Sequence, residues 1–422
     1  MIRARTLALA SLFLAPAAMA GCSSSGSANV GASVDPIVDV EHTPVERQSI
    51  GNCWIYAQAT WVESMHKTEA HEDFDVSQSY WTYWHWFDEI TGGSASTEVS
   101  TGGNQFTSNQ IVIERGVVPE GSFVPEDTTA EMSARQSRAL NEINREIKEG
   151  VLKTPEARED AKLVRTTLNK AWGLSDEVKA LLDTTFGEDG RTTLSATSAS
   201  PKDTPIISAA DFKVKYSKRA ADGTSAMKSA TLADAMNEWR SASYPSATAT
   251  GNSSRRGFLT RVQRALHDRQ PVVVTWNVEF NAMESGDNER RGSFNMTTLT
   301  TKAKPGHQGG HMTVLEDYEA ETTEFGLLKA GVTLDPSKAD DQLRLDAALL
   351  PTTTIKFLRI KNSWGAVRDD RSSAPGFPGY HDLYMDYLNG PISWCPDEKS
   401  PTVDNCKGTT IPLRTVLLPP GY

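Results

Sequence analysis

Three short segments of the chain carry residue types that nucleophilic catalysis requires, and the first surrounds Cys53. A thiol at the start of a helical pattern has its thiolate stabilised by the helix dipole and by unpaired backbone N–H groups. Gly51 allows a close approach of substrate, Trp54 follows the thiol, and the amide of Gln48 can donate to a developing oxyanion. We therefore predict Cys53 as nucleophile, Gln48 as oxyanion donor, and Gly51 and Trp54 as cleft residues. The alternative is an inert buried cysteine.

The second segment places His311 after Gly309-Gly310 and before an apolar run typical of a strand, residues 312–315. An imidazole presented at a strand edge can pair with a thiol, keep the sulfur ionised and return the proton to a leaving amine. We predict His311 as this base and Gly310 as a cleft residue. A structural histidine is one alternative. A metal pair with His307 is another, but the glycine-rich sequence offers no helix to align the two rings, and we expect no metal.

The third segment contains Asn362 and Trp364, directly after the strand pattern of residues 355–360. The Asn362 side chain can hold the far nitrogen of an imidazole and so select its tautomer, and Trp364 can cover that hydrogen bond from water. Both residues are therefore candidates for the site, with Trp364 lining the cleft. A simple turn is the alternative interpretation of Asn-Ser-Trp-Gly.

The order Cys53, His311, Asn362, with these flanks, resembles the papain superfamily of cysteine peptidases. The long gap after the cysteine is similar to the bleomycin hydrolase and aminopeptidase C branch, which carries a large helical insertion. Residues 76–84 resemble the helix that follows the catalytic one in that branch. The next stretch is similar too, with Gly102-Gly103 in a glycine-rich turn that we count among the cleft candidates, and a Gly-Val-Val-Pro sequence at residues 116–119.

The resemblance implies an α+β, papain-like two-lobed fold, with a helical N-terminal lobe, a β-rich C-terminal lobe and the active site in the cleft between them. It also implies peptide hydrolysis through a thioester acyl-enzyme, without a cofactor, on a peptide or protein substrate. One departure concerns the oxyanion donor. The family glutamine lies six residues before the cysteine, where this chain has Arg47, whereas Gln48 lies five before it. A catalytically inactive scaffold of the same fold and a thiol-dependent amidase or transpeptidase are the alternatives.

Composition and charge narrow the class of partner. The chain has 422 residues, of which 38% are hydrophobic and 23% charged, and a formal net charge of −11. A charge of this sign argues against nucleic-acid binding, because little would neutralise the phosphates. Arg255-Arg256 and Arg290-Arg291 are the longest basic runs noted, and we interpret them as solvated loop charges.

The first residues have the features of a targeting segment. Basic residues precede an apolar run that is too short to span a bilayer, so we predict a signal peptide at residues 1–21. Small residues before Cys22 resemble a bacterial lipoprotein cleavage box, which predicts acylation of Cys22, a flexible tether over residues 22–40, and a lipid-anchored protein of the cell envelope. Ordinary secretion after Ala18-Met19-Ala20 is the alternative.

The rest of the chain is expected to form a helical lobe at residues 41–189, a Ser/Thr-rich insertion or linker at 190–255, and a β-rich lobe at 256–422. Within the last lobe, the spacing of Cys395 and Cys406 suits a disulfide-closed loop in an oxidising compartment. Helices are predicted after Cys53, from Ser77, from Asn104, across 128–183, near 232–239 and over 258–267. Strands are predicted at 271–276, 312–315 and 355–360.

Overall fold

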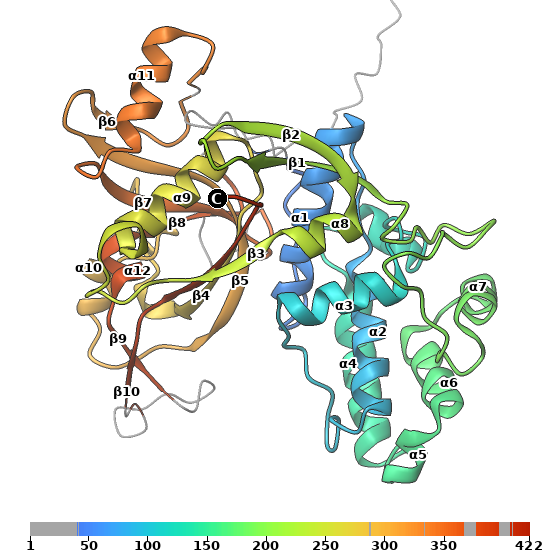
Figure 1. Cartoon of the computed structure of the whole chain (residues 1–422). Coiled ribbons are helices and arrows are strands. Elements are labelled where there is room, and N and C mark those ends of the chain that lie inside the picture. The colour runs from blue at the N-terminus through green and yellow to red at the C-terminus, as the bar shows by residue number, and fades with distance from the viewer. Residues whose placement is uncertain are drawn as a thin grey trace, which may run out of the picture.

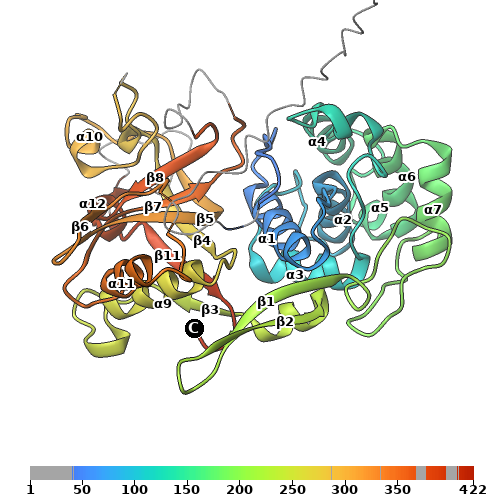
Figure 2. The same ribbon diagram turned by 90° about the horizontal axis from the view of Figure 1, so that it is seen from above.

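The computed structural model describes residues 40, 42–286, 288–332, 334–366, 377–395, 406 and 408–422. Helices occupy the first part of the described chain and a large sheet occupies the second, and the two parts lie side by side (Figures 1 and 2). The predicted α+β class is thereby confirmed. Cys22 and the predicted signal peptide lie outside the described residues.

The helical part is built around α1, the helix that begins at the candidate nucleophile. Its helices are α1 (Cys53–Ala70), α2 (Gln78–Thr91), α3 (Gln105–Arg115), α4 (Ala134–Lys148), α5 (Pro155–Glu159), α6 (Ala161–Trp172) and α7 (Asp176–Phe186). Two predicted starts are confirmed by capping hydrogen bonds. The Ser77 side chain accepts from the amide of Tyr80, and that of Asn104 accepts from the amides of Phe106 and Thr107.

The aromatic stripe of α2 forms much of the core of the helical part. Tyr80, Tyr83, Trp84 and Phe87 are all buried there. The guanidinium of Arg115 lies 3.9 Å from the centre of the Trp84 ring, so a cation–π contact ties α3 to α2. This packing holds the helices that support α1.

The second part is dominated by a seven-stranded antiparallel sheet, in the order β3-β11-β4-β5-β7-β8 with β6 paired to β5. Its strands are β3 (Arg240–Ser243), β4 (Val273–Glu279), β5 (Gln308–Thr322), β6 (Gly326–Leu328), β7 (Thr354–Lys361), β8 (Tyr380–Tyr384) and β11 (Leu413–Leu418). Around it lie α9 (Arg255–His267), α10 (Met296–Thr300), α11 (Ala339–Ala348), α12 (Met385–Asn389) and the small pair β9 (Ile392–Trp394) and β10 (Gly408–Thr410). The three predicted strands are confirmed as parts of β4, β5 and β7.

The two faces of this sheet have different partners. Val273, Met312 and Val314 point toward the core that contains α1, whereas Val274 and Trp276 belong to the core that contains α9. The alternation follows from the two-residue period of a strand. The central strands β4 and β5 are therefore buried on both sides, and β5 contacts α1 directly.

Residues 190–255 include a hairpin, a short helix and the edge strand of the sheet. The hairpin consists of β1 (Lys213–Arg219) and β2 (Ser225–Thr231), and β1 packs on α1. The predicted helix near 232–239 is confirmed as α8 (Leu232–Glu238), which a Thr231–Asp234 capping box begins. The described helices include none with the length and apolarity that a membrane crossing requires.

Candidate active site

Cys53 is the first residue of α1 and lies in the contact between that helix and β5. The side chain of Asn52 does not cap the helix but donates to Thr82 and Gln136, at 3.0 Å each. The first N–H groups of α1 therefore remain for the sulfur. Backbone amides of Cys53 and Trp54, and that of Met312 on β5, act on the thiol as hydrogen-bond donors.

The thiol has little contact with solvent, since Cys53 is 9% exposed. Burial raises the pKa of the Cys53 thiol to about 11, and the three backbone amides only reduce this effect. The helix start that the sequence predicted to favour the thiolate is thus outweighed by desolvation. At neutral pH the sulfur needs a nearby base to take its proton.

The candidate for that base is His311 on β5, one residue before Met312. Its Nε2 lies 2.8 Å from Oδ1 of Asn362, an oxygen that also accepts from the amide of Ser363 at 2.8 Å. Because Oδ1 is an acceptor, Nε2 carries the hydrogen and Nδ1 is the basic nitrogen of the neutral ring. This arrangement selects the tautomer that can accept a thiol proton.

Two tryptophans hold the imidazole in place. The Trp364 ring stacks on that of His311, with centroids 4.8 Å apart and planes inclined by 22°. The Trp276 ring meets the same imidazole edge-on at 5.6 Å, from the residue opposite His311 in the β4–β5 register. Trp364 is 3% exposed and stacks directly on the imidazole.

The fold places the three sequence-distant candidates on adjoining elements. The amide that reaches the Cys53 sulfur belongs to Met312, the neighbour of His311, and Asn362 follows directly after β7, the strand next to β5. Strand pairing positions the imidazole and the amide, and the contact of α1 with β5 brings the thiol to Met312, the residue after His311.

Gln48 is attached to the same segment through Ser363. The backbone N–H of Gln48 donates to the Ser363 carbonyl at 2.9 Å, and the side-chain Oε1 of Gln48 accepts from Ser363 Oγ at 2.7 Å. Its Nε2 donates to the carbonyl of Ile50 at 2.7 Å, which uses one of two hydrogens. Arg47 instead pairs through its backbone with Trp364. Ser363, which follows Asn362 in the sequence, was missed by the sequence analysis.

The remaining cleft candidates on the helical side gather next to the start of α1. The Trp54 indole donates to the Thr101 carbonyl at 2.9 Å, and a Cβ at Gly103 would collide with that indole. A Cβ at Gly51 would meet the Thr101 hydroxyl. Gly51, Gly102 and Gly103 are exposed, so they form an open wall beside the buried thiol.

On the sheet side, Gly310 is exposed on β5, and a Cβ there would meet nothing within 4 Å. This position lies opposite Asn277 of β4, directly before His311. Exposed glycines therefore lie beside the start of α1 and directly before His311 on β5.

A charge cluster that was not expected from the sequence reaches from the buried Glu63 to the exposed Asp75. Carboxylate oxygens of Glu46, Glu63 and Asp75 come within 4.8 Å of one another. Lys361, the neighbour of Asn362, faces them from β7, and its ammonium donates to Thr43 Oγ1 at 3.1 Å, which in turn donates to Glu63. The ammonium of Lys361 thus places a positive charge beside these carboxylates.

The charge cluster shifts the pKa of its members. Burial, and then the neighbouring charge of Asp75, raise the pKa of Glu63 to about 7. Burial lowers the pKa of Lys361, while the carboxylates of Glu63, Glu46 and Asp75 oppose that shift. Because Glu63 belongs to α1 and Lys361 to β7, the cluster joins the helix of the thiol to the strand that leads to Asn362.

The predicted disulfide between Cys395 and Cys406 is confirmed. The residues at the end of the printed sequence include β11, which lies between β3 and β4. Tyr422 lies beside α9, where its main-chain oxygen accepts a hydrogen bond from Arg261 at 2.8 Å.

Comparison with known proteins finds no matching family model and no significant match among curated proteins. Solved structures do match. PepW from Lactobacillus rhamnosis HN001 is 11% identical, with 90% of this chain and 81% of that one covered and a TM-score of 0.41. Xylellain, a cysteine protease from Xylella fastidiosa, is 12% identical, with 83% and 80% covered and a TM-score of 0.33.

A third similar structure contains the cysteine protease and lectin-like domains of Cwp84, a surface layer associated protein of Clostridium difficile. It is 11% identical, with 88% of this chain and 50% of that one covered and a TM-score of 0.31. Xylellain and Cwp84 are of the enzyme class that the sequence motifs resemble. At these identities and TM-scores the likeness does not bear on activity, which rests on the geometry of the site.

Proposed function

We propose that this chain is a cysteine peptidase of papain type that hydrolyses peptide bonds through a thioester acyl-enzyme. The observation that carries the proposal is the 2.8 Å contact between His311 Nε2 and Asn362 Oδ1. It leaves the basic Nδ1 on an imidazole whose neighbour, Met312, donates to the Cys53 sulfur. A buried thiol with a raised pKa gains its proton acceptor from this arrangement.

In the proposed reaction the Cys53 proton passes to Nδ1 of His311, and the sulfur attacks the carbonyl carbon of the substrate. The backbone N–H of Cys53 and the second Nε2 hydrogen of Gln48 stabilise the oxyanion. The imidazolium then protonates the departing amine as the C–N bond breaks, which leaves a thioester. Water, deprotonated by His311, attacks the thioester, and the acid is released as the thiol regains its proton.

The decisive experiment is labelling of the intact protein with a thiol-reactive epoxide of the E-64 type, followed by mass spectrometry of the modified peptide. We expect one label, on Cys53, with a rate that falls strongly in His311→Ala. Peptide digestion, assayed in parallel, should be lost in Cys53→Ala. Labelling that is absent, or that is equally fast without the imidazole, would reject the peptidase assignment.

One observation favours an inactive scaffold as the second candidate. The Gln48 amide already donates to Ile50 and accepts from Ser363, so it is held within the loop. A scaffold predicts that Gln48→Ala leaves any residual activity unchanged. The peptidase predicts a loss of about 10²–10³ in kcat, the usual effect of removing one oxyanion donor.

The peptide digestion assay with an added amine separates hydrolysis from acyl transfer, because a transpeptidase would join the acyl group to that amine.

We further propose that the chain is exported and anchored by a lipid on Cys22. The test is membrane fractionation of cells that express the full chain, with Cys22→Ala as the comparison. Release of that variant from the membrane fraction is expected, and equal retention of both forms would contradict the anchor.

A further inference from the structure

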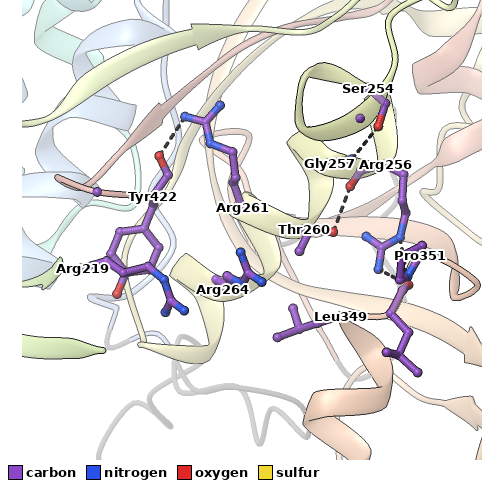
Figure 3. A pocket seen from close by; sticks show the side chains of 13 residues that line it. Arg219, Ser254, Arg256, Gly257, Thr260, Arg261, Arg264, Leu349, Pro351 and Tyr422 are labelled. Atoms are coloured by element: carbon purple, nitrogen blue, oxygen red, sulfur yellow. Dashed lines mark hydrogen bonds between the residues drawn. The ribbon is translucent and has the colours of Figure 1, made fainter. Parts of the chain in front are cut away.

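A cavity of about 850 Å³ lies beside α9, on the side of the sheet opposite α1. Figure 3 shows that arginine side chains from the end of β1 and from α9 surround it together with Tyr422. These arginines are Arg219, Arg256, Arg261 and Arg264. Each is only partly exposed, so the cavity concentrates positive charge away from bulk water.

The spacing of the arginines along α9 explains why they line the same side of the cavity. The cavity is lined by Arg256, Thr260 and Arg264, which repeat every four residues, and by Arg261 beside them. This spacing places them on one face of a helix. The opposite face is buried in the core, and the whole of α9 contains no acidic residue to pair with its arginines.

Among the described residues, no ion pair joins an arginine of this cavity to a side-chain carboxylate, although the charge of Arg219 acts on Asp222. In the described part of the chain, the arginine ion pairs involve other positions, Arg115, Arg135, Arg145, Arg165 and Arg359. Burial, and the like charge of Arg264, lower the pKa of Arg256. Asp268, at the C-terminal end of α9, accepts a hydrogen bond from the Tyr422 hydroxyl and does not line the cavity.

The arginines of the cavity differ in how many of their hydrogen-bond donors are already bound within the protein. The guanidinium of Arg256 is bound to the carbonyls of Ala348 and Leu350, at 2.9 Å each, and holds the end of α11. Arg261 uses one donor on the main-chain oxygen of Tyr422. Arg219 lies 5.9 Å from the Tyr422 ring centre and its charge also acts on Asp222, whereas Arg264 forms no ion pair with a side chain among the described residues. Fork-shaped donors therefore remain for a ligand.

We propose that this cavity binds a small organic anion with two or more phosphate or carboxylate groups. Arginine forks match both groups in a bidentate manner, and the cavity has the size of ordinary small-molecule sites. Leu349, Leu350 and Pro351 provide an apolar wall for the organic part of such a ligand. The N-terminus of α9, capped by Ser254 at one end of the cavity, adds to the positive potential.

The test is isothermal titration calorimetry of the full chain with two probes, inorganic tripolyphosphate and citrate, at constant ionic strength. We expect saturable binding of one molecule per chain to at least one probe, with a dissociation constant below about 1 mM. The tighter probe identifies phosphate or carboxylate as the preferred group. Absence of saturable binding to either probe would overturn the proposal.

Variants assign the binding to the cavity. Arg264→Gln and Arg219→Gln should each weaken binding by about ten-fold or more, because each removes a charged hydrogen-bond donor. Arg138→Gln, an exposed position on α4, makes the same change in net charge and should stay within about two-fold. Thermal unfolding checks that each variant is folded. If one of the two cavity variants does not fold, the other is sufficient for the test. Equal affinity in the folded cavity variants, or equal loss in Arg138→Gln, would refute the site.

Discussion

Replacing His311 by alanine should uncover the intrinsic acidity of the buried thiol. Burial holds the pKa of Cys53 at about 11, so without a base only about one thiol in 10⁴ is ionised at pH 7. If the imidazole takes the proton in the wild type, nearly every sulfur can be a thiolate at that pH. The fraction of reactive sulfur then differs by about 10⁴.

The expected difference in rate is smaller than this ratio of populations. A thiolate whose pKa is lower by about four units is also a weaker nucleophile, by about 10² at the usual Brønsted slope. Alkylation by iodoacetamide at pH 7 should therefore be about 10² slower in His311→Ala than in the wild type. The variant's rate should rise about ten-fold per pH unit toward pH 11, while the wild type stays nearly level.

The assay measures alkylation of Cys53 by mass spectrometry from pH 5 to 10. His307→Ala serves as the matched control, because that exposed histidine precedes β5 by one residue and should leave the profile unchanged. If His311→Ala and the wild type react at the same rate at pH 7, the imidazole does not take the proton, and the reasoning from the site geometry is refuted.

Three other changes test the contacts around the site. Asn362→Ala removes the 2.8 Å hydrogen bond to the imidazole. It should lower kcat/KM for a peptide by about 10–100-fold, because a hydrogen bond to a charged ring contributes about 1.5–3 kcal/mol. An unchanged kcat/KM would contradict the orienting role. Ser363→Ala frees Oε1 of Gln48 and should lower kcat with little effect on KM, whereas a change in KM alone would argue against the oxyanion role. Glu63 has a pKa raised from its ordinary value to about 7, so the folded state holds its proton more tightly, and the stability that this proton provides is full below pH 4.5 and is lost as the pH rises through 7. In wild type, the free energy of unfolding should fall between pH 5 and pH 8 by on the order of a few kcal/mol, and Glu63→Gln should reduce this fall. Urea titrations at each pH measure it. An equal pH dependence in the variant would contradict the raised pKa of Glu63.

The sequence analysis selected the residues of the candidate site from local patterns. The glycine before Cys53, the glycines before His311 and the Asn-Ser-Trp-Gly segment at Asn362 each indicate a particular backbone position. Helix caps such as Ser77 and Asn104 were equally local, since the side chain bonds to an amide two or three residues ahead. Short-range physical causes of this kind can be inferred from one chain segment at a time.

Contacts between distant segments could not be inferred in this way. The sequence placed Gln48 near the thiol, but its bonds to Ser363, 315 residues away, depend on how the helical part meets β7. The cluster of Glu63 and Lys361 has the same origin, because burial and charge pairing arise only after packing. The pKa of Cys53 also depends on packing, because the local sequence favoured the thiolate and tertiary burial opposed the thiolate.

The sequence by itself determined which side chains can react and which elements carry them, because these follow from residue type and the periods of helix and strand. The tertiary structure alone decided which groups share a low-dielectric environment. It buried the Cys53 thiol beside β5 and turned the arginine face of α9 toward a cavity with Arg219 instead of open solvent. Desolvation and charge pairing depend on distances in space, and a linear sequence does not contain those distances.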